Sequence, residues 1–254
     1  DDFGNGDMPI IFIHGFPFSK VMWADQMELL KDTTRVIAYD IRGYGKSTAG
    51  DEEQSMNLFA DDLSDFMDAL QIEKAIICGF SMGGYTLLNA LGRYSDKFAA
   101  LVLCDTQCIA DSPEVKDKRN EIIAGVKAGK MNDFTETFLA AVFCPASMDM
   151  KPESVDKARN IIHTTSPITI AGGLAAISKR TDTCSNLDQI SIPTLILCGE
   201  EDTVTPMAQS EFLHEHIKNS ELHIIEGAGH MSNIEQRDEF NKHLLRFVRS
   251  LAKK

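Results

Sequence analysis

The stretch GFSMGG, residues 79–84, places a single serine between glycines at the junction of two different patterns. The apolar run KAIIC before it is typical of a buried strand, and YTLLNALGRY after it has helical spacing. Ser81 therefore lies on a strand-to-helix turn within G-x-S-x-G, the context of a nucleophile elbow. Such a turn projects the serine hydroxyl over the sheet edge, beside helix N–H groups that favour negative charge. The alternative is a serine that only caps the helix.

The rest of the chain predicts an α/β fold, with a mostly parallel central sheet flanked by helices. Six short apolar runs alternate with helical patterns: PIIFIHG, TRVIAYD, KAIICGF, AALVLCD, PTLILCGE and ELHIIEG. Runs of this kind suit strands that are buried on both faces, and their alternation with helices favours parallel crossovers. We expect helices over 55–70, 83–94 and 233–252, the first opened by Ser55.

The alternation of strands and helices stops between LVLCD and IPTLILCG. Residues 110–190 show helical periodicity throughout, and a structureless loop of that length is improbable in a compact domain. We therefore expect a helical cap insertion over 110–190, between two parts of one core domain, residues 1–109 and 191–254. The cap should lie over the sheet edge where ligands bind in open parallel sheets.

A serine hydroxyl needs a base and an orienting acid before it acts as a nucleophile. His230, in GAGH, follows the last apolar run, and Asp202, in GEED, follows the preceding one. The order Ser81, Asp202, His230 is a known arrangement of such a triad. Asp105, at the end of LVLCD, is the alternative acid.

The stretch HGFP, residues 14–17, supplies a candidate oxyanion hole. The backbone N–H groups of Phe16 and Met82 could both face a developing negative charge at Ser81. His14 is expected to brace this loop. Candidate pocket residues lie in the same region and in the cap, where ordinary helix packing explains them equally well: Phe18, Trp23, Phe134, Phe138, Leu139, Val142 and Phe143.

Composition excludes several classes of partner. The chain has 25 basic and 38 acidic residues, a net charge of −13, so it repels nucleic acid and anionic membranes. It has no apolar run near the roughly 20 residues that span a bilayer, and no signal-peptide pattern. We expect a soluble, cytoplasmic protein. The printed sequence starts at Asp1, so residues that precede it in the native protein are left open.

The six cysteines show no CxxC or zinc-ligand spacing. Cys78, Cys104 and Cys198 each lie near the end of an apolar run, where a small apolar side chain packs well. We expect reduced core thiols rather than disulfides or a metal site, which weakly favours the cytoplasm.

Five stretches, in this order, carry a family resemblance: HGFP, DIRGYGKS, GFSMGG, GEEDTVTP and GAGH. Over nearly its whole length the chain resembles the α/β-hydrolase family, above all the small bacterial esterases, enol-lactonases and cofactor-free haloperoxidases. The resemblance implies an eight-stranded, mostly parallel sheet with a helical cap after the sixth strand. DDFGNGD looks like the end of the second strand, so the antiparallel edge should be short or missing. Serine in place of aspartate argues against haloalkane dehalogenases and epoxide hydrolases.

The sequence thus predicts a hydrolase of small carboxylic esters, with short to medium acyl or aryl groups and lactones as candidate substrates. An acyl-enzyme on Ser81 requires neither a cofactor nor a metal. A dicarboxylate lactone would need a cation, for which Arg42, Lys179 and Arg180 are the candidates. The alternatives are a signalling or ligand-sensing protein with slow turnover, and a perhydrolase or haloperoxidase in which peroxide replaces water. The oligomeric state is left open.

Overall fold

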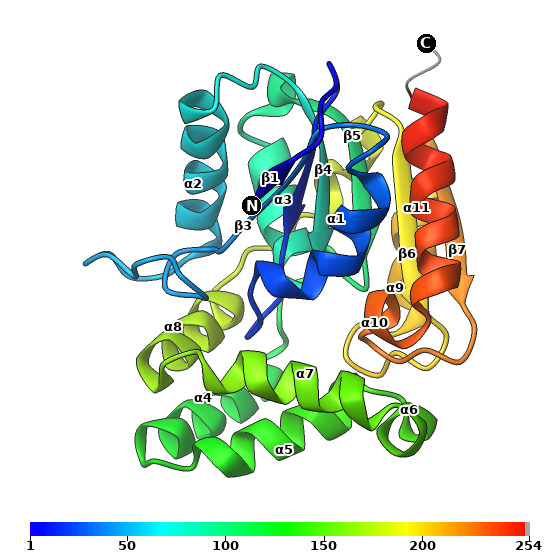
Figure 1. Cartoon of the computed structure of the whole chain (residues 1–254). Coiled ribbons are helices and arrows are strands. Elements are labelled where there is room, and N and C mark those ends of the chain that lie inside the picture. Colours follow the sequence, from blue (N-terminus) through cyan, green and yellow to red (C-terminus); the bar gives the residue numbers. More distant parts are fainter. Residues whose placement is uncertain (252–254) are drawn as a thin grey trace.

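The computed structural model describes residues 1–251 and shows a seven-stranded sheet in the order β1-β3-β2-β4-β5-β6-β7 (Figure 1). The strands are β1 (Asp2–Phe3), β2 (Ile10–Ile13), β3 (Val36–Tyr39), β4 (Ala75–Phe80), β5 (Phe98–Cys104), β6 (Thr194–Gly199) and β7 (Ser220–Ile225). Only β1 pairs antiparallel, with β3, and it has just two residues. The mostly parallel sheet and its short antiparallel edge are therefore confirmed.

The central strands are buried on both faces, which explains their unbroken apolar sequences. Every residue of β2, β4 and β6 is buried, and the parallel register pairs Ile11 with Ile77. Helices flank the sheet, as Figure 1 shows for α2 and α11. The core helices are α1 (Ala24–Leu30), α2 (Met56–Ala69), α3 (Met82–Leu91), α9 (Met207–His216), α10 (Ser232–Glu235) and α11 (Arg237–Leu251). Short 3₁₀ turns complete the core at Lys20–Trp23, Ser95–Lys97 and Cys184–Gln189.

Capping side chains explain where helices begin. The Ser55 hydroxyl accepts a hydrogen bond of 3.1 Å from the N–H of Leu58 and so opens α2 as expected. The single helix expected over 233–252 is instead two helices, because Gln236 (φ −124°, ψ 54°) leaves the helical region between α10 and α11. Residue 252, to which the sequence pattern extends that helix, lies outside the described residues.

Five helices lie between β5 and β6: α4 (Pro113–Lys127), α5 (Met131–Val142), α6 (Pro145–Met150), α7 (Pro152–His163) and α8 (Pro167–Ser178). Figure 1 shows them as a separate layer, green to yellow-green, at one end of the sheet. Serine caps followed by proline begin α4 and α8, at Ser112 and Ser166. These five helices are called the cap below.

The expectation of six reduced cysteines is wrong. Cys108 and Cys184 form a disulfide whose Cα atoms lie 4.9 Å apart, across a sequence separation of 76 residues. Cys108 lies where the chain enters the cap and Cys184 where it returns to the core. Spacing along the sequence could not reveal the pair, because the two thiols meet only when the whole cap has folded back. The other four cysteines, Cys78, Cys104, Cys144 and Cys198, are buried and free.

A buried ion pair joins the same two ends of the cap. Arg180 and Asp111 are joined at 2.7 Å, and each side chain is only 3% exposed. The Arg180 guanidinium also donates to the carbonyl of Ile109, and it lies 4.4 Å from the ring centroid of Tyr85 on α3. Both ends of the cap are therefore fixed to each other and to the helix that follows Ser81.

Among residues 1–251, no single helix has both the length and the apolar composition to cross a membrane. The cap helices α7 and α8 pass that test only as a pair, joined at a bend of 97°.

Replacement of both disulfide cysteines, Cys108→Ser with Cys184→Ser, should lower the free energy of unfolding by about 2–4 kcal/mol, because the bond constrains a long loop in the unfolded chain. Denaturant unfolding under oxidising conditions measures this loss. Reduced wild type is the control and should match the double variant. Equal stability of the oxidised wild type and the variant would contradict the bond's role.

Candidate active site

Ser81 lies on a strained turn between β4 and α3. Its backbone has φ 51° and ψ −113°, a conformation that non-glycine residues rarely adopt. Two hydrogen bonds hold the turn: the Ser81 N–H donates to the carbonyl of Cys104, and the Thr106 hydroxyl donates to the carbonyl of Ser81, each at 2.9 Å. The hydroxyl is thereby fixed at the N-terminus of α3, over the carboxyl ends of the strands.

The glycine after this turn permits a close approach of chains. A Cβ at Gly83 would lie 2.4 Å from the carbonyl oxygen of Ile13, at the end of β2. Any larger residue would push α3 away from β2. The loop that follows β2 therefore lies beside Ser81.

Three side chains from separate loops form one hydrogen-bonded series. His230 Nε2 lies 2.9 Å from Ser81 Oγ, and His230 Nδ1 lies 2.7 Å from Asp202 Oδ2. Asp202 and His230 are buried, and Ser81 retains 8% exposure. With Nδ1–H donated to the carboxylate, Nε2 is free to accept the serine proton. The structure thus brings together the three residues that the sequence selected for this role.

Asp202 is held in its ionised form. Burial alone would raise its pKa, but His230 and the hydrogen bonds from Thr205 outweigh burial and lower the pKa below its usual value. The N–H groups of Val204 and Thr205 donate to Oδ1 at 2.8 and 3.0 Å, and the Thr205 hydroxyl donates to Oδ2 at 2.7 Å. Sequence reasoning missed Thr205, whose position in EDTVTP three residues after the acid was the available signal.

Asp105, the alternative acid, lies in the same region but bonds to other groups. It accepts a hydrogen bond of 2.9 Å from the N–H of Gly199 and a second from the Ser232 hydroxyl. Its side chain is fully buried, and burial together with the nearby charge of Asp202 raises its pKa well above the usual value. Because the His230 ring bonds to Asp202, Asp202 is the acid that is placed to orient the imidazole.

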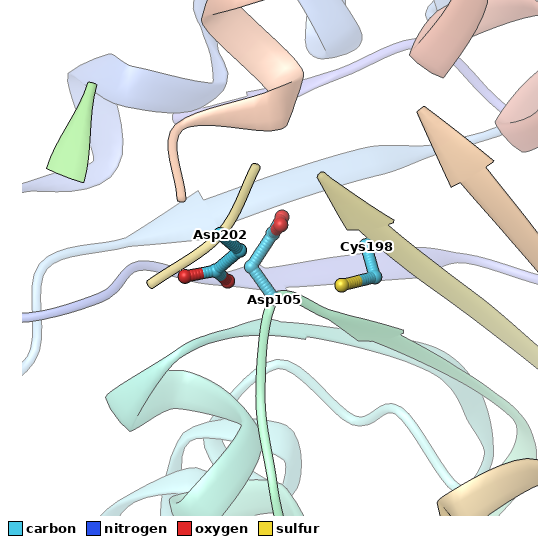
Figure 2. A group of neighbouring side chains, drawn as sticks. All are labelled: Asp105, Cys198 and Asp202. Atoms are coloured by element: carbon cyan, nitrogen blue, oxygen red, sulfur yellow. The ribbon is translucent and has the colours of Figure 1, made fainter. Parts of the chain in front are cut away.

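Figure 2 shows Asp105, Cys198 and Asp202 side by side, and their potential ligand atoms lie within 4.8 Å of one another. Every carboxylate oxygen of the group already accepts a hydrogen bond, as described above. The Cys198 thiol donates to the carbonyl of Gly199, and burial raises its pKa. We therefore interpret the cluster as a hydrogen-bonded support of the acid loop and assign no metal to it.

The loop after β2 presents the first of the two candidate oxyanion donors. The His14 side chain is fully buried, and burial lowers its pKa to about 4, so the ring is neutral. Its Nε2 accepts a hydrogen bond from the N–H of Ile41, so Nδ1 donates to the carbonyl of Gly15, both at 2.9 Å. Within residues 1–251, neither the N–H of Phe16 nor that of Met82 donates to another group.

Comparison with known proteins assigns the chain to a family. Residues 8–236 match the family model described as alpha/beta hydrolase fold. The chain belongs to this family. It is 33% identical to 3-oxoadipate enol-lactonase 1 of Acinetobacter baylyi, over 95% of this chain and 89% of that one. It is 31% identical to the bifunctional esterase/perhydrolase DCH of Acinetobacter calcoaceticus, over 98% and 95%. A thermophilic esterase from Thermogutta terrifontis, solved with malate bound, superimposes with a TM-score of 0.95 at 32% identity, over 99% and 92%.

The expected pocket residues of this hydrolase fall into different environments. The Phe16 ring meets Phe134 and Phe138 of α5 at centroid distances of 6.2 and 6.0 Å, and Phe18 meets Phe138 at 5.9 Å. Val142 and Phe143 are buried at the end of α5. Trp23 instead lies in the core and packs against the rings of Phe12, Phe80 and Phe240.

The three candidate cations for a substrate carboxylate are all engaged elsewhere. Arg42 pairs with Asp62 and Glu52, and Lys179 pairs with Glu53. Arg180 forms the ion pair that joins the two ends of the cap, as described above. None of these three side chains is assigned to the site.

Glu235 is a buried carboxylate that sequence reasoning missed, because NIEQR resembles an exposed helix. It is 1% exposed. Its Oε1 accepts from the N–H groups of Gly229 and Met231 at 2.9 and 3.2 Å, and its Oε2 accepts from Cys144 at 2.8 Å. A Cβ at Gly229 would lie only 2.6 Å from the Cys144 nitrogen. Glu235 therefore joins the His230 loop to the end of α5.

Glu235→Gln should lower the free energy of unfolding by about 1–3 kcal/mol, because an amide NH₂ would replace an oxygen that faces a buried N–H. Glu200→Gln is the matched control. Glu200 accepts from Gly227 in the same loop at 3.2 Å but is exposed, so its replacement should change stability by less than about 0.5 kcal/mol. Equal effects of the two variants, measured by denaturant unfolding, would show that Glu235 is not a structural clamp.

Proposed function

We propose that this α/β hydrolase is a serine esterase that cleaves neutral carboxylic esters with short to medium acyl or aryl groups, lactones included, through an acyl-enzyme on Ser81. The observation that carries the proposal is the unbroken hydrogen-bonded series from Ser81 Oγ through the His230 ring to Asp202 Oδ2. A helix-capping serine would not need a buried imidazole and carboxylate aligned behind it.

In the first half-reaction, His230 Nε2 takes the proton of Ser81 as Oγ attacks the ester carbonyl carbon. The N–H groups of Phe16 and Met82, together with the N-terminus of α3, stabilise the oxyanion of the tetrahedral intermediate. His230 then gives the proton to the leaving alcohol oxygen as the C–O bond breaks. Asp202 stabilises the imidazolium while it exists.

In the second half-reaction, a water molecule gives a proton to His230 as its oxygen attacks the acyl carbon. The bond between that carbon and Ser81 Oγ then breaks, His230 returns the proton to Oγ, and the acid is released. Hydrogen peroxide in place of water would give a peracid at the same site. The relative named as a bifunctional esterase/perhydrolase supports this second activity.

The surroundings of the site favour a neutral acyl group. The rings of Phe16, Phe134 and Phe138 form an apolar wall at the loop that carries the Phe16 N–H, and Arg42, Lys179 and Arg180 are paired with carboxylates. A carboxylated lactone would bury its charge against this wall unpaired, at a cost of several kcal/mol. A sensing protein with the same triad would differ by slow turnover, which kinetics on p-nitrophenyl acetate detects.

The disulfide weakens the sequence-based expectation of a cytoplasmic location, since such bonds persist mainly in oxidising compartments. Trapping of free thiols in the source cell, followed by mass analysis of Cys108 and Cys184, would decide between the two settings.

Ser81→Ala should reduce kcat for p-nitrophenyl acetate by about 10⁴- to 10⁶-fold, because it removes the nucleophile and leaves the oxyanion donors in place. Thermal unfolding of the variant should match that of the wild type and serves as the control for folding. A variant that folds normally and keeps wild-type kcat would overturn the proposed function.

The two neighbouring acids give a matched pair. Asp202→Asn should lower kcat by about 10⁴-fold, because the amide cannot stabilise the imidazolium. Asp105→Asn should keep activity within about tenfold, since the amide has the same shape, its oxygen can accept from the N–H of Gly199, and its NH₂ can donate to the Ser232 oxygen. The opposite ranking would assign the acid to Asp105.

Asp105 should also make stability depend on pH. Its raised pKa means that its contribution to folding is complete below about pH 4 and is lost as pH rises toward the raised value. The stability of Asp105→Asn relative to wild type should therefore increase between pH 5 and pH 8, as measured by urea unfolding. A difference that stays constant over this range would contradict the raised pKa of Asp105.

A further inference from the structure

A cavity of about 310 Å³ lies between the cap helices α4 and α5. Its walls include Ile122, Gly125 and Val126 from α4 and Phe134, Phe138 and Ala141 from α5. The α5 residues recur at intervals of three and four, so they share one helix face. We call this cavity the α4–α5 groove.

The groove is open at Gly125 because glycine has no side chain to fill the space there. A Cβ at that position would meet only Lys130 Cδ, at 4.0 Å. Ala141, which lines the groove from α5, is also small and is exposed. Small residues on both helices thus leave a groove whose lining surface is mostly apolar, although Lys130, Asp133 and Thr137 also border it.

Two side chains that line the groove also contact the loop after β2. Phe134 and Phe138 line the groove, and their rings contact the ring of Phe16, an expected oxyanion residue. At Ala141, the carbonyl accepts a hydrogen bond of 3.3 Å from the Thr203 hydroxyl, next to Asp202.

Val142, the next residue of α5, contacts the loop that carries His230. The carbonyl of Val142 accepts a hydrogen bond of 3.1 Å from the N–H of Met231, next to His230. The same end of α5 therefore contacts the loops of both the base and the acid.

We propose that the α4–α5 groove binds the aliphatic acyl chain of the ester substrate, with the carbonyl at Ser81 and the chain running outward along α5. This proposal rests on the esterase function proposed above and adds the class of acyl group. The cavity volume lies at the lower end of small-molecule pockets, and an apolar lining suits an unbranched alkyl chain. Each methylene buried there should raise kcat/KM by about fourfold.

Gly125→Leu fills the groove without a backbone penalty, because Gly125 is helical and has open space at its Cβ. Ala124→Leu is the matched control, an exposed position one residue earlier that does not line the groove. Ala141→Leu and Ala140→Leu form a second such pair on α5. The measurement is kcat/KM for p-nitrophenyl acetate and p-nitrophenyl decanoate.

The groove variants Gly125→Leu and Ala141→Leu should lower kcat/KM for the decanoate at least tenfold and for the acetate less than twofold, while the control variants change neither. Equal losses on both esters, or no loss on either, would overturn the groove assignment and leave the esterase proposal standing. Hydrolysis that survives in Ser81→Ala would overturn the esterase proposal instead.

The affinity of sodium decanoate for Ser81→Ala, measured by calorimetry, tests the groove without turnover. Addition of Gly125→Leu should weaken this binding at least tenfold, and unchanged affinity would contradict the proposal.

Discussion

The turn at Ser81 is the constraint on which the rest of the site depends. A non-glycine residue at positive φ is costly, and here the cost is offset by hydrogen bonds to Cys104 and Thr106 at the end of the neighbouring strand. The turn therefore ties β4 to β5 and fixes the start of α3 in one step. Because parallel strands end at the same edge, the loops after β2, β6 and β7 then reach the serine without further adjustment.

Three buried carboxyl groups around this turn have different tasks because their partners differ. Asp202 faces an imidazole and several donors, which lower its pKa. Asp105 lies close to that charge, and burial with repulsion raises its pKa. Glu235 faces three backbone N–H groups and joins the histidine loop to the cap. The same functional group thus orients the imidazole in one place, supports the acid loop with a raised pKa in another, and clamps two segments together in the third.

The parts of the structure that are encoded locally could be predicted from the sequence. The parallel strands follow from their apolar runs, the turn from G-x-S-x-G, and the grouping of Ser81, Asp202 and His230 from their positions after strands. The Cys108–Cys184 bond, the clamp at Glu235 and the core position of Trp23 could not be predicted, because each depends on where distant segments meet. The break at Gln236 was hidden for a different reason: the helical periodicity continues through it.

The account's central claim is that Ser81 is activated as a nucleophile by His230 and Asp202, and labelling with a fluorophosphonate probe tests it most directly. Peptide mapping by mass spectrometry should find one adduct, on Ser81, formed rapidly in wild type and at least about 10³-fold more slowly in Asp202→Asn. An adduct on another residue, or equal labelling rates in the two proteins, would contradict the account.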